Sequence, residues 1–307
     1  MSRIVSDGLH RRAFLQNGAL FLSGGAAPSL FASKAKPLRV GVITDIHYAD
    51  KAAGGSRHYR DSIAKMQTAV KAFNQHGVDF AIELGDLIDA AKNSVEAEIG
   101  YLRTIDAEYA KCRAPRYYVF GNHCLDMLNR KEFAANSGAN EQGHYSFDRG
   151  SYHFVVLHSC YTSAGTPYSR KNFRWTDANI PAAQLEWLAQ DLATTTRPTI
   201  VFVHQRLDEA GSHMVRNAAH VRGILEESAK VLAVFQGHSH RNTHRNINGI
   251  HYTTLRGMVE GRGVQNNGYS EVLLHSDGSI VVTGFAHQAS YAWKKAFFSG
   301  QDAEAGR

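Results

Sequence analysis

The stretch GVITDIH, residues 41–47, ends a short apolar run with an Asp-x-His pair. The run from Leu38 to Ile43 has the length and composition of a buried β-strand. Asp45 and His47 therefore follow a predicted strand directly. Because ligands in open α/β sheets gather outside the carboxyl ends of the strands, this junction is both the first element of the fold and a candidate site.

Outward from this stretch, predicted strands alternate with predicted helices. Strands at 78–84 and 116–120 follow helices at 58–74 and 96–110, and this alternation implies parallel pairing through right-handed crossovers. Next come a hairpin at 144–157 and a helix opened by Pro181. Strands at 199–203 and 231–235 flank a helix at 215–228, and C-terminal strands follow at 250–255, 269–275 and 279–283. The pattern predicts an α/β fold of two mixed β-sheets packed face to face with helices outside. Two long loops are expected at 129–143 and 161–180.

Four further polar clusters also stand at predicted strand ends. They are Gly85-Asp86-Leu87-Ile88-Asp89, Gly121-Asn122-His123, His204 and Gly237-His238-Ser239-His240. Residues two apart on a strand point the same way, which explains the Asp-x-His and His-x-His spacings. A single strand-end histidine has an ordinary explanation in packing, but five such clusters in one chain do not. Their carboxylate, amide and imidazole groups suit two metal ions in one site, and such pairs hydrolyse bonds, usually at phosphorus.

Composition limits the alternatives. The chain has 307 residues, 43% of them hydrophobic, which is enough for one sizeable core. Its formal net charge is +6, yet no basic block is interleaved with aromatics, so no nucleic-acid partner is expected. The three cysteines are an odd number without a Cys-x-x-Cys pair, so no disulfide framework is implied.

Residues 1–35 are interpreted as a targeting segment ahead of an enzyme domain at 36–307. Arg11 and Arg12 precede a weakly apolar run at 19–32, which is too short and too broken to span a bilayer. This order resembles a bacterial twin-arginine signal, with cleavage after Ala35. It predicts a periplasmic or secreted protein that uses the twin-arginine export machinery and has no membrane span. The alternative is an N-terminal tail without a targeting role.

The five clusters in their order resemble the calcineurin-like metallophosphoesterases. This resemblance implies a four-layer αββα sandwich of two mixed β-sheets flanked by helices. It implies that one metal is held by Asp45, His47 and His240, that the other is held by Asn122, His204 and His238, and that Asp86 bridges both. Mixed nitrogen and oxygen ligands suit Mn, Fe, Zn or Co, so the metal identity stays open. The implied reaction is attack on phosphorus by a metal-bound hydroxide.

The same resemblance makes His123 a catalytic residue that protonates the leaving oxygen or stabilises the transition state. Asp89 is expected to orient a ligand or a backbone turn from outside the ligand set. The family usually places Asp or Glu directly after Gly-Asn-His, whereas this chain has Cys124, whose thiol is a weak hydrogen-bond partner. Asp126 is a candidate to replace the missing carboxylate.

Residues 41–50, 57–62, 184–188 and 255–260 resemble blocks of the manganese-dependent ADP-ribose/CDP-alcohol diphosphatases. This implies a small phosphorylated substrate of the nucleotide type. Arg57 and Arg60 are candidates for binding a substrate phosphate, with a solvated helix start as the alternative. The aromatic residues of the 161–180 loop either stack on a base or pack locally; they are Tyr161, Tyr168, Phe173 and Trp175. A broad-specificity phosphomonoesterase and a non-catalytic metal-binding scaffold are the alternative functions.

Overall fold

The structure is a computed structural model that describes residues 36–208 and 211–294. Contacts between Cα atoms divide the chain into two units, residues 1–36 and 37–307. The expected signal segment at 1–35 lies outside the described residues.

The first sheet has six strands in the order β12-β11-β10-β1-β2-β3. Their bounds are Leu38–Ile43 (β1), Phe80–Glu83 (β2), Arg116–Tyr118 (β3), Gly268–Leu274 (β10), Ile280–Ala286 (β11) and Tyr291–Trp293 (β12). β1 runs parallel to β2, with Val40 opposite Phe80, and antiparallel to β10, with Val40 opposite Val272. The sheet is therefore mixed, because the parallel strands come from βαβ units and the C-terminal strands from hairpins.

The second sheet also has six strands, in the order β4-β5-β6-β7-β9-β8. Their bounds are Tyr145–Arg149 (β4), Tyr152–Val156 (β5), Thr199–Phe202 (β6), Val231–Gln236 (β7), Thr243–Ile247 (β8) and Ile250–Thr254 (β9). β5, β6, β7 and β9 are parallel neighbours, while β4 and β8 pair antiparallel at the two edges. This sheet is mixed as well.

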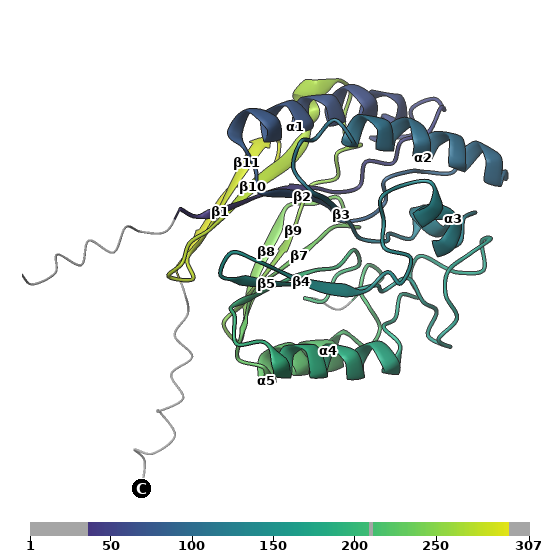
Figure 1. Ribbon diagram of the computed structural model, residues 1–307. Helices are drawn as coiled ribbons and strands as arrows, with labels where there is room; N and C mark the ends of the chain where they lie inside the picture. The colour runs from purple at the N-terminus through teal and green to yellow at the C-terminus, as the bar shows by residue number, and fades with distance from the viewer. Residues whose placement is uncertain (1–35, 209–210, 295–307) are drawn as a thin grey trace, which may run out of the picture. The chain divides into compact units, whose positions relative to one another are not determined.

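Helices cover the outer face of each sheet, as Figure 1 shows. The helices α1 (Ser62–His76) and α2 (Val95–Tyr109) pack on the first sheet, and α4 (Ala182–Thr194) and α5 (Ala218–Glu227) on the second. Between the sheets, Val40 and Val42 of β1 meet Phe154 and Phe202 in a separate apolar cluster. Ile43 instead belongs to the cluster under α1 and α2, as strand alternation requires. The predicted four-layer α/β fold is confirmed.

Three elements were missed in the sequence. The helix α3 (Arg130–Ala135) lies inside the expected loop at 129–143, and a capping box between Asn129 and Glu132 fixes its start. The edge strand β8 is mostly polar and partly exposed, and β12 has only three residues, so neither forms an apolar run of ordinary strand length. Single 3-10 turns complete the description at Tyr59–Asp61 (η2), His123–Leu125 (η3) and Val264–Asn266 (η4).

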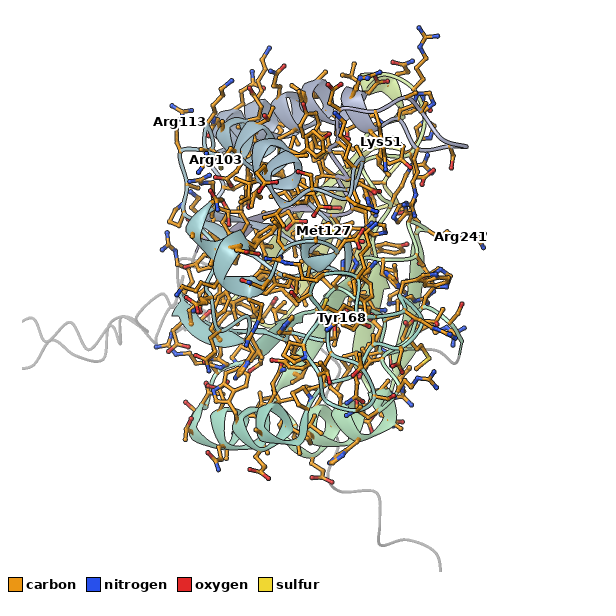
Figure 2. The ribbon with its side chains drawn as sticks, turned by 90° about the vertical axis from the view of Figure 1, so that its right-hand side faces the viewer. Lys51, Arg103, Arg113, Met127, Tyr168 and Arg241 are labelled. Atoms are coloured by element: carbon orange, nitrogen blue, oxygen red, sulfur yellow. The ribbon has the colours of Figure 1, made fainter. Side chains whose placement is uncertain are left out.

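The parallel strands of both sheets end on the same side of the domain, at the right of Figure 1. Figure 2 looks onto that side, where Lys51, Met127 and Tyr168 are labelled; they belong to the connections after β1, β3 and β5. Within the described residues, the helices are too short or too polar to cross a membrane.

Candidate metal centre

Five of the polar residues at the strand ends adopt left-handed backbone conformations. The φ angles are 52° at Asp45, 47° at His47, 59° at Asp86, 68° at His238 and 57° at His240. A Cβ atom makes this region unfavourable, and such residues persist where the surrounding structure holds them. The Asp-x-His and His-x-His spacings therefore come from left-handed turns that follow the strands. The explanation from strand alternation was wrong, although the residues that it selected do gather.

The first group of candidate ligands comprises Asp45, His47 and His240, whose donor atoms all lie within 4.8 Å of one another. The Nε2 atoms of His47 and His240 are 3.1 Å apart, and His240 Nε2 is 3.2 Å from Asp45 Oδ1. All three residues are buried or nearly so. Two imidazole nitrogens and a carboxylate oxygen thus face one common point.

The second group comprises Asp86, His204 and His238, again within 4.8 Å. Asp86 Oδ2 is 3.0 Å from His204 Nε2 and 3.6 Å from His47 Nε2, so one oxygen faces both groups. The other oxygen, Asp86 Oδ1, accepts a hydrogen bond from the His123 backbone N–H at 2.7 Å. The Asp86 carboxylate therefore stands between the two groups and is held there by the chain.

Contacts behind the groups fix the orientation of the imidazole rings. His47 Nδ1 donates to Asp89 Oδ2 at 3.0 Å, His240 Nδ1 to Glu260 Oε1 at 2.7 Å, and His204 Nδ1 to the Leu84 carbonyl at 2.9 Å. Carboxylate and carbonyl oxygens only accept hydrogen bonds, so each Nδ1 bears a proton and Nε2 is the ring nitrogen left to face the centre. Carboxylate–histidine contacts of this kind are typical behind metal-ligating imidazoles.

The donor set fits divalent metal ions. Among the described residues, His238 Nε2 has no hydrogen-bond partner although the side chain is buried. Burial lowers the pKa of His238 well below its ordinary value, so this imidazole is neutral and offers a lone pair. Burial opposes ionisation of Asp86, but His204 and His123 outweigh it and lower the pKa of the carboxyl. The ionised carboxylate of Asp86 and the neutral imidazole of His238 are donor groups for Mn, Fe, Zn or Co.

Asn122 lies at the same centre, buried and lining its cavity. Its Oδ1 accepts a hydrogen bond from Gln205 Nε2 at 3.5 Å. Gly121, just before it, makes room for Asp86, because a Cβ atom at residue 121 would lie 2.8 Å from Asp86 Cγ and closer still to Oδ1. The glycine of Gly-Asn-His thus allows the close approach of Asp86.

Asp89, rather than Cys124 or Asp126, supplies the carboxylate beside His123. Asp89 Oδ1 is 3.5 Å from His123 Nδ1, while its second oxygen holds His47. Cys124 is fully buried, and its sulfur accepts a hydrogen bond from the Leu87 N–H at 3.4 Å. In the described part of the chain, no ion pair joins Asp126 to His123. One aspartate therefore contacts both a candidate ligand and the candidate catalytic histidine.

A cavity of about 380 Å³ opens onto the centre. Its lining includes Arg57, His123, Trp175 and His213, together with Asp86, Asn122, His238 and His240. Arg60, in contrast, pairs with Asp50 at 2.6 Å, and both side chains are exposed. The structure thus brings Arg57 to the cavity and leaves Arg60 outside its lining.

Two residues at the site escaped the sequence-based selection. Glu260 was noticed only within a block of resemblance, and no spacing rule links it to His240, which it contacts through a loop. His213 belongs to none of the five clusters, yet its ring centroid is 5.3 Å from that of His238. Neither follows a strand directly, so the signal used for the other residues was absent.

Comparisons with known proteins agree with this geometry. A family model described as calcineurin-like phosphoesterase matches residues 38–242. Manganese-dependent ADP-ribose/CDP-alcohol diphosphatases from Oryza sativa subsp. japonica and Arabidopsis thaliana are 29% and 28% identical; the alignments cover 75% and 76% of this chain and 87% and 90% of those proteins. A crystal structure of a dimetal phosphatase from Danio rerio superposes with a TM-score of 0.76 at 20% identity, covering 85% of this chain and 100% of that one. The structural likeness is one of fold.

Proposed function

This chain belongs to the calcineurin-like phosphoesterase family, and we propose that it hydrolyses the diphosphate bond of small nucleotide-type substrates. The observation that carries the proposal is the position of Asp86 Oδ2, which faces His204 Nε2 at 3.0 Å and His47 Nε2 at 3.6 Å. One carboxylate oxygen between two sets of nitrogen ligands is the arrangement that a metal pair requires. The names of the plant relatives support a diphosphate as the substrate.

In this proposal the residues have separate tasks. One ion would be held by Asp45, His47 and His240, the other by Asn122, His204 and His238, with Asp86 shared. When bound, the two ions supply a water acidified toward neutral pH and neutralise charge on the phosphoryl oxygens. Asp89, Glu260 and the Leu84 carbonyl hold the imidazole rings so that Nε2 faces the centre.

His123 would give a proton to the leaving oxygen. It lines the cavity at Asp86 and has a carboxylate oxygen of Asp89 at 3.5 Å from Nδ1. Burial opposes protonation of His123, yet the Asp86 and Asp89 carboxylates outweigh it and raise the pKa of the imidazole. A protonated imidazole at the cavity wall is a suitable general acid. Arg57, which also lines the cavity, would bind a phosphoryl oxygen of the substrate.

A substrate screen with added manganese tests the function. CDP-choline and ADP-ribose should be hydrolysed with a higher kcat/KM than p-nitrophenyl phosphate or cyclic AMP, and a chelator should abolish the activity. Faster turnover of p-nitrophenyl phosphate would make the protein a broad-specificity phosphomonoesterase. Bound metal without turnover of any of these compounds would make it a binding scaffold.

We also propose that residues 1–35 direct export through the twin-arginine machinery to the periplasm or beyond. The support is the order of Arg11, Arg12, the apolar run and the small residues before residue 36. The full chain should reach the periplasm of a bacterial host that has this machinery. Replacing Arg11 and Arg12 with lysine should retain it in the cytoplasm, and equal export of both chains would contradict the proposal.

A further inference from the structure

Trp175 exposes its indole in a loop whose other aromatic side chains are buried or packed. Its exposed fraction is 45%, the largest among the big hydrophobic side chains in the described ranges. In the same loop, Tyr168 and Phe173 stack on each other with ring centroids 4.0 Å apart, and Tyr161 is buried. Local packing therefore accounts for three of the four aromatics and leaves Trp175 without such an explanation.

The indole lies against the metal centre. Its ring centroid is 5.9 Å from that of His238 and 5.0 Å from that of His213, and these two histidine rings are 5.3 Å apart. The three rings come from three separate connections of the chain, after β5, β6 and β7. All three line the centre's cavity, as does Arg57.

A second cavity, of about 450 Å³, lies beside the first and shares three lining residues with it: Asn122, His123 and Trp175. Its other lining residues include Phe173, Lys171, Arg174 and Asp126, so it combines aromatic surface with two cationic side chains and one carboxyl group. Each cavity alone falls within the range of about 300–1,000 Å³ that small-molecule sites occupy. Trp175 stands where the two cavities adjoin.

A planar aromatic group next to an anionic one is the ligand chemistry that matches this arrangement. Any nucleobase can stack on an exposed indole, whatever hydrogen-bonding groups the base carries, because every base has a π-face. Lys171 and Arg174 favour negative charge beside it, which is where the phosphates of a nucleotide would pass toward His123. A phosphoester with neither a planar aromatic group nor a cationic group would gain little from the indole.

We propose that Trp175 is the specificity-determining residue that stacks on the nucleobase of the substrate, with the nucleoside seated in the second cavity. This inference rests on the proposed hydrolysis of nucleotide-type diphosphates. It goes beyond that function because it assigns to Trp175 the selection of substrates that carry a nucleobase. It also gives the exposed indole a ligand.

The test compares CDP-choline with its base-free analogue, 1-O-methylribose 5-diphosphocholine, on the manganese-loaded full chain. Trp175→Ala should lower the ratio of kcat/KM between the two substrates by about 5- to 150-fold, the range for removal of one aromatic–base stack. Trp175→Phe retains a stacking face and should keep most of the preference. A loss that is equal for the two substrates leaves the ratio unchanged. It would indicate a structural role or a contact with the choline that both substrates carry, and it would overturn the proposal.

Binding gives a second readout that does not depend on turnover. Titration of the metal-loaded chain with CMP should quench tryptophan fluorescence, whereas ribose 5-phosphate should not. Trp175→Phe should remove most of this quenching, while Trp187→Phe, in the helix α4, should leave it in place. If the wild type does not hydrolyse diphosphates but still shows this pattern, the proposed function is wrong, while the stacking of a nucleobase on Trp175 remains supported. Quenching that survives in Trp175→Phe and disappears in Trp187→Phe would refute the stacking of a nucleobase on Trp175.

Discussion

Replacing Gly257 with alanine tests whether His240 and Asp45 must stay in their observed positions. A Cβ atom on residue 257 would lie 2.7 Å from His240 Cγ, 3.0 Å from His240 Nδ1 and 3.1 Å from Asp45 Cβ. An ordinary van der Waals contact begins at 3.4 Å, so the His240 ring would have to move by about 0.7 Å. The new methyl group thus presses on two of the three candidate ligands of the first group.

The loop at residue 257 has little freedom to retreat instead. The backbone N–H groups of Met258 and Val259 donate to the carbonyls of Thr44 and Asp45, both at 3.0 Å. From the other side, the buried Lys65 ammonium donates to the Met258 and Glu260 carbonyls at 2.8 and 2.9 Å. Because the loop is held on both sides, the displacement falls mainly on the ligands.

We expect Gly257→Ala to lower kcat/KM by about 10²-fold, since a misplacement near 1 Å has about that effect on catalysis. Over-packing of this kind costs about 1–3 kcal/mol, or roughly 2–4 °C in Tm per kcal/mol for a domain of this size. The assays are CDP-choline hydrolysis, metal content by mass spectrometry and thermal unfolding. The metal content per folded chain should fall as well.

Gly100→Ala is the matched control. Gly100 lies in α2, and a Cβ atom there would meet nothing within 4 Å. This substitution should leave metal content and activity unchanged and stabilise the helix by about 0.5–1 kcal/mol. A Gly257→Ala protein that retains its full metal content and a kcat/KM within threefold of wild type would refute the reasoning about His240 and Asp45.

Three further substitutions have clear expected outcomes. His123→Ala should lower kcat by about 10²–10⁴-fold with both metals retained, and unchanged turnover would remove it from the mechanism. Asp86→Asn should weaken metal binding by more than the roughly 100-fold that loss of an outer contact costs, as measured by dialysis against a chelator. His153→Gln concerns stability: His153 is 2.8 Å from Asp191 and from Asp148, and these carboxylates raise its pKa. A raised pKa adds stability that is present below the unfolded value near 6.5 and is lost as the pH rises through the folded value. The Tm deficit of His153→Gln should therefore shrink above neutral pH, and a deficit that grows with pH would contradict this assignment.

The sequence predicted the fold and the residues that gather, because both depend on local patterns. Apolar runs such as Leu38–Ile43 define strands, and polar residues directly after them identify the functional edge. The contacts of Asp89 were harder to predict from the sequence. Its two oxygens reach His47 at 3.0 Å and His123 at 3.5 Å, which requires residues 42 and 34 positions away in the chain to be in place. The sequence showed that Cys124 replaces the usual carboxylate after Gly-Asn-His. It did not show that Asp89 is the residue whose carboxylate lies beside His123 instead.

By itself, the sequence determined which residue types are available and in which order. That was enough to predict the family and the four-layer arrangement of sheets and helices. Only the tertiary structure decided their directions and partners: the left-handed turns at Asp45 and Asp86, the contact of Glu260 with His240, and the exposure of Trp175 beside His238. The physical reason is that strand and helix formation follow local periodicity. A side chain's orientation at a site, in contrast, follows from packing among segments that are distant in the chain.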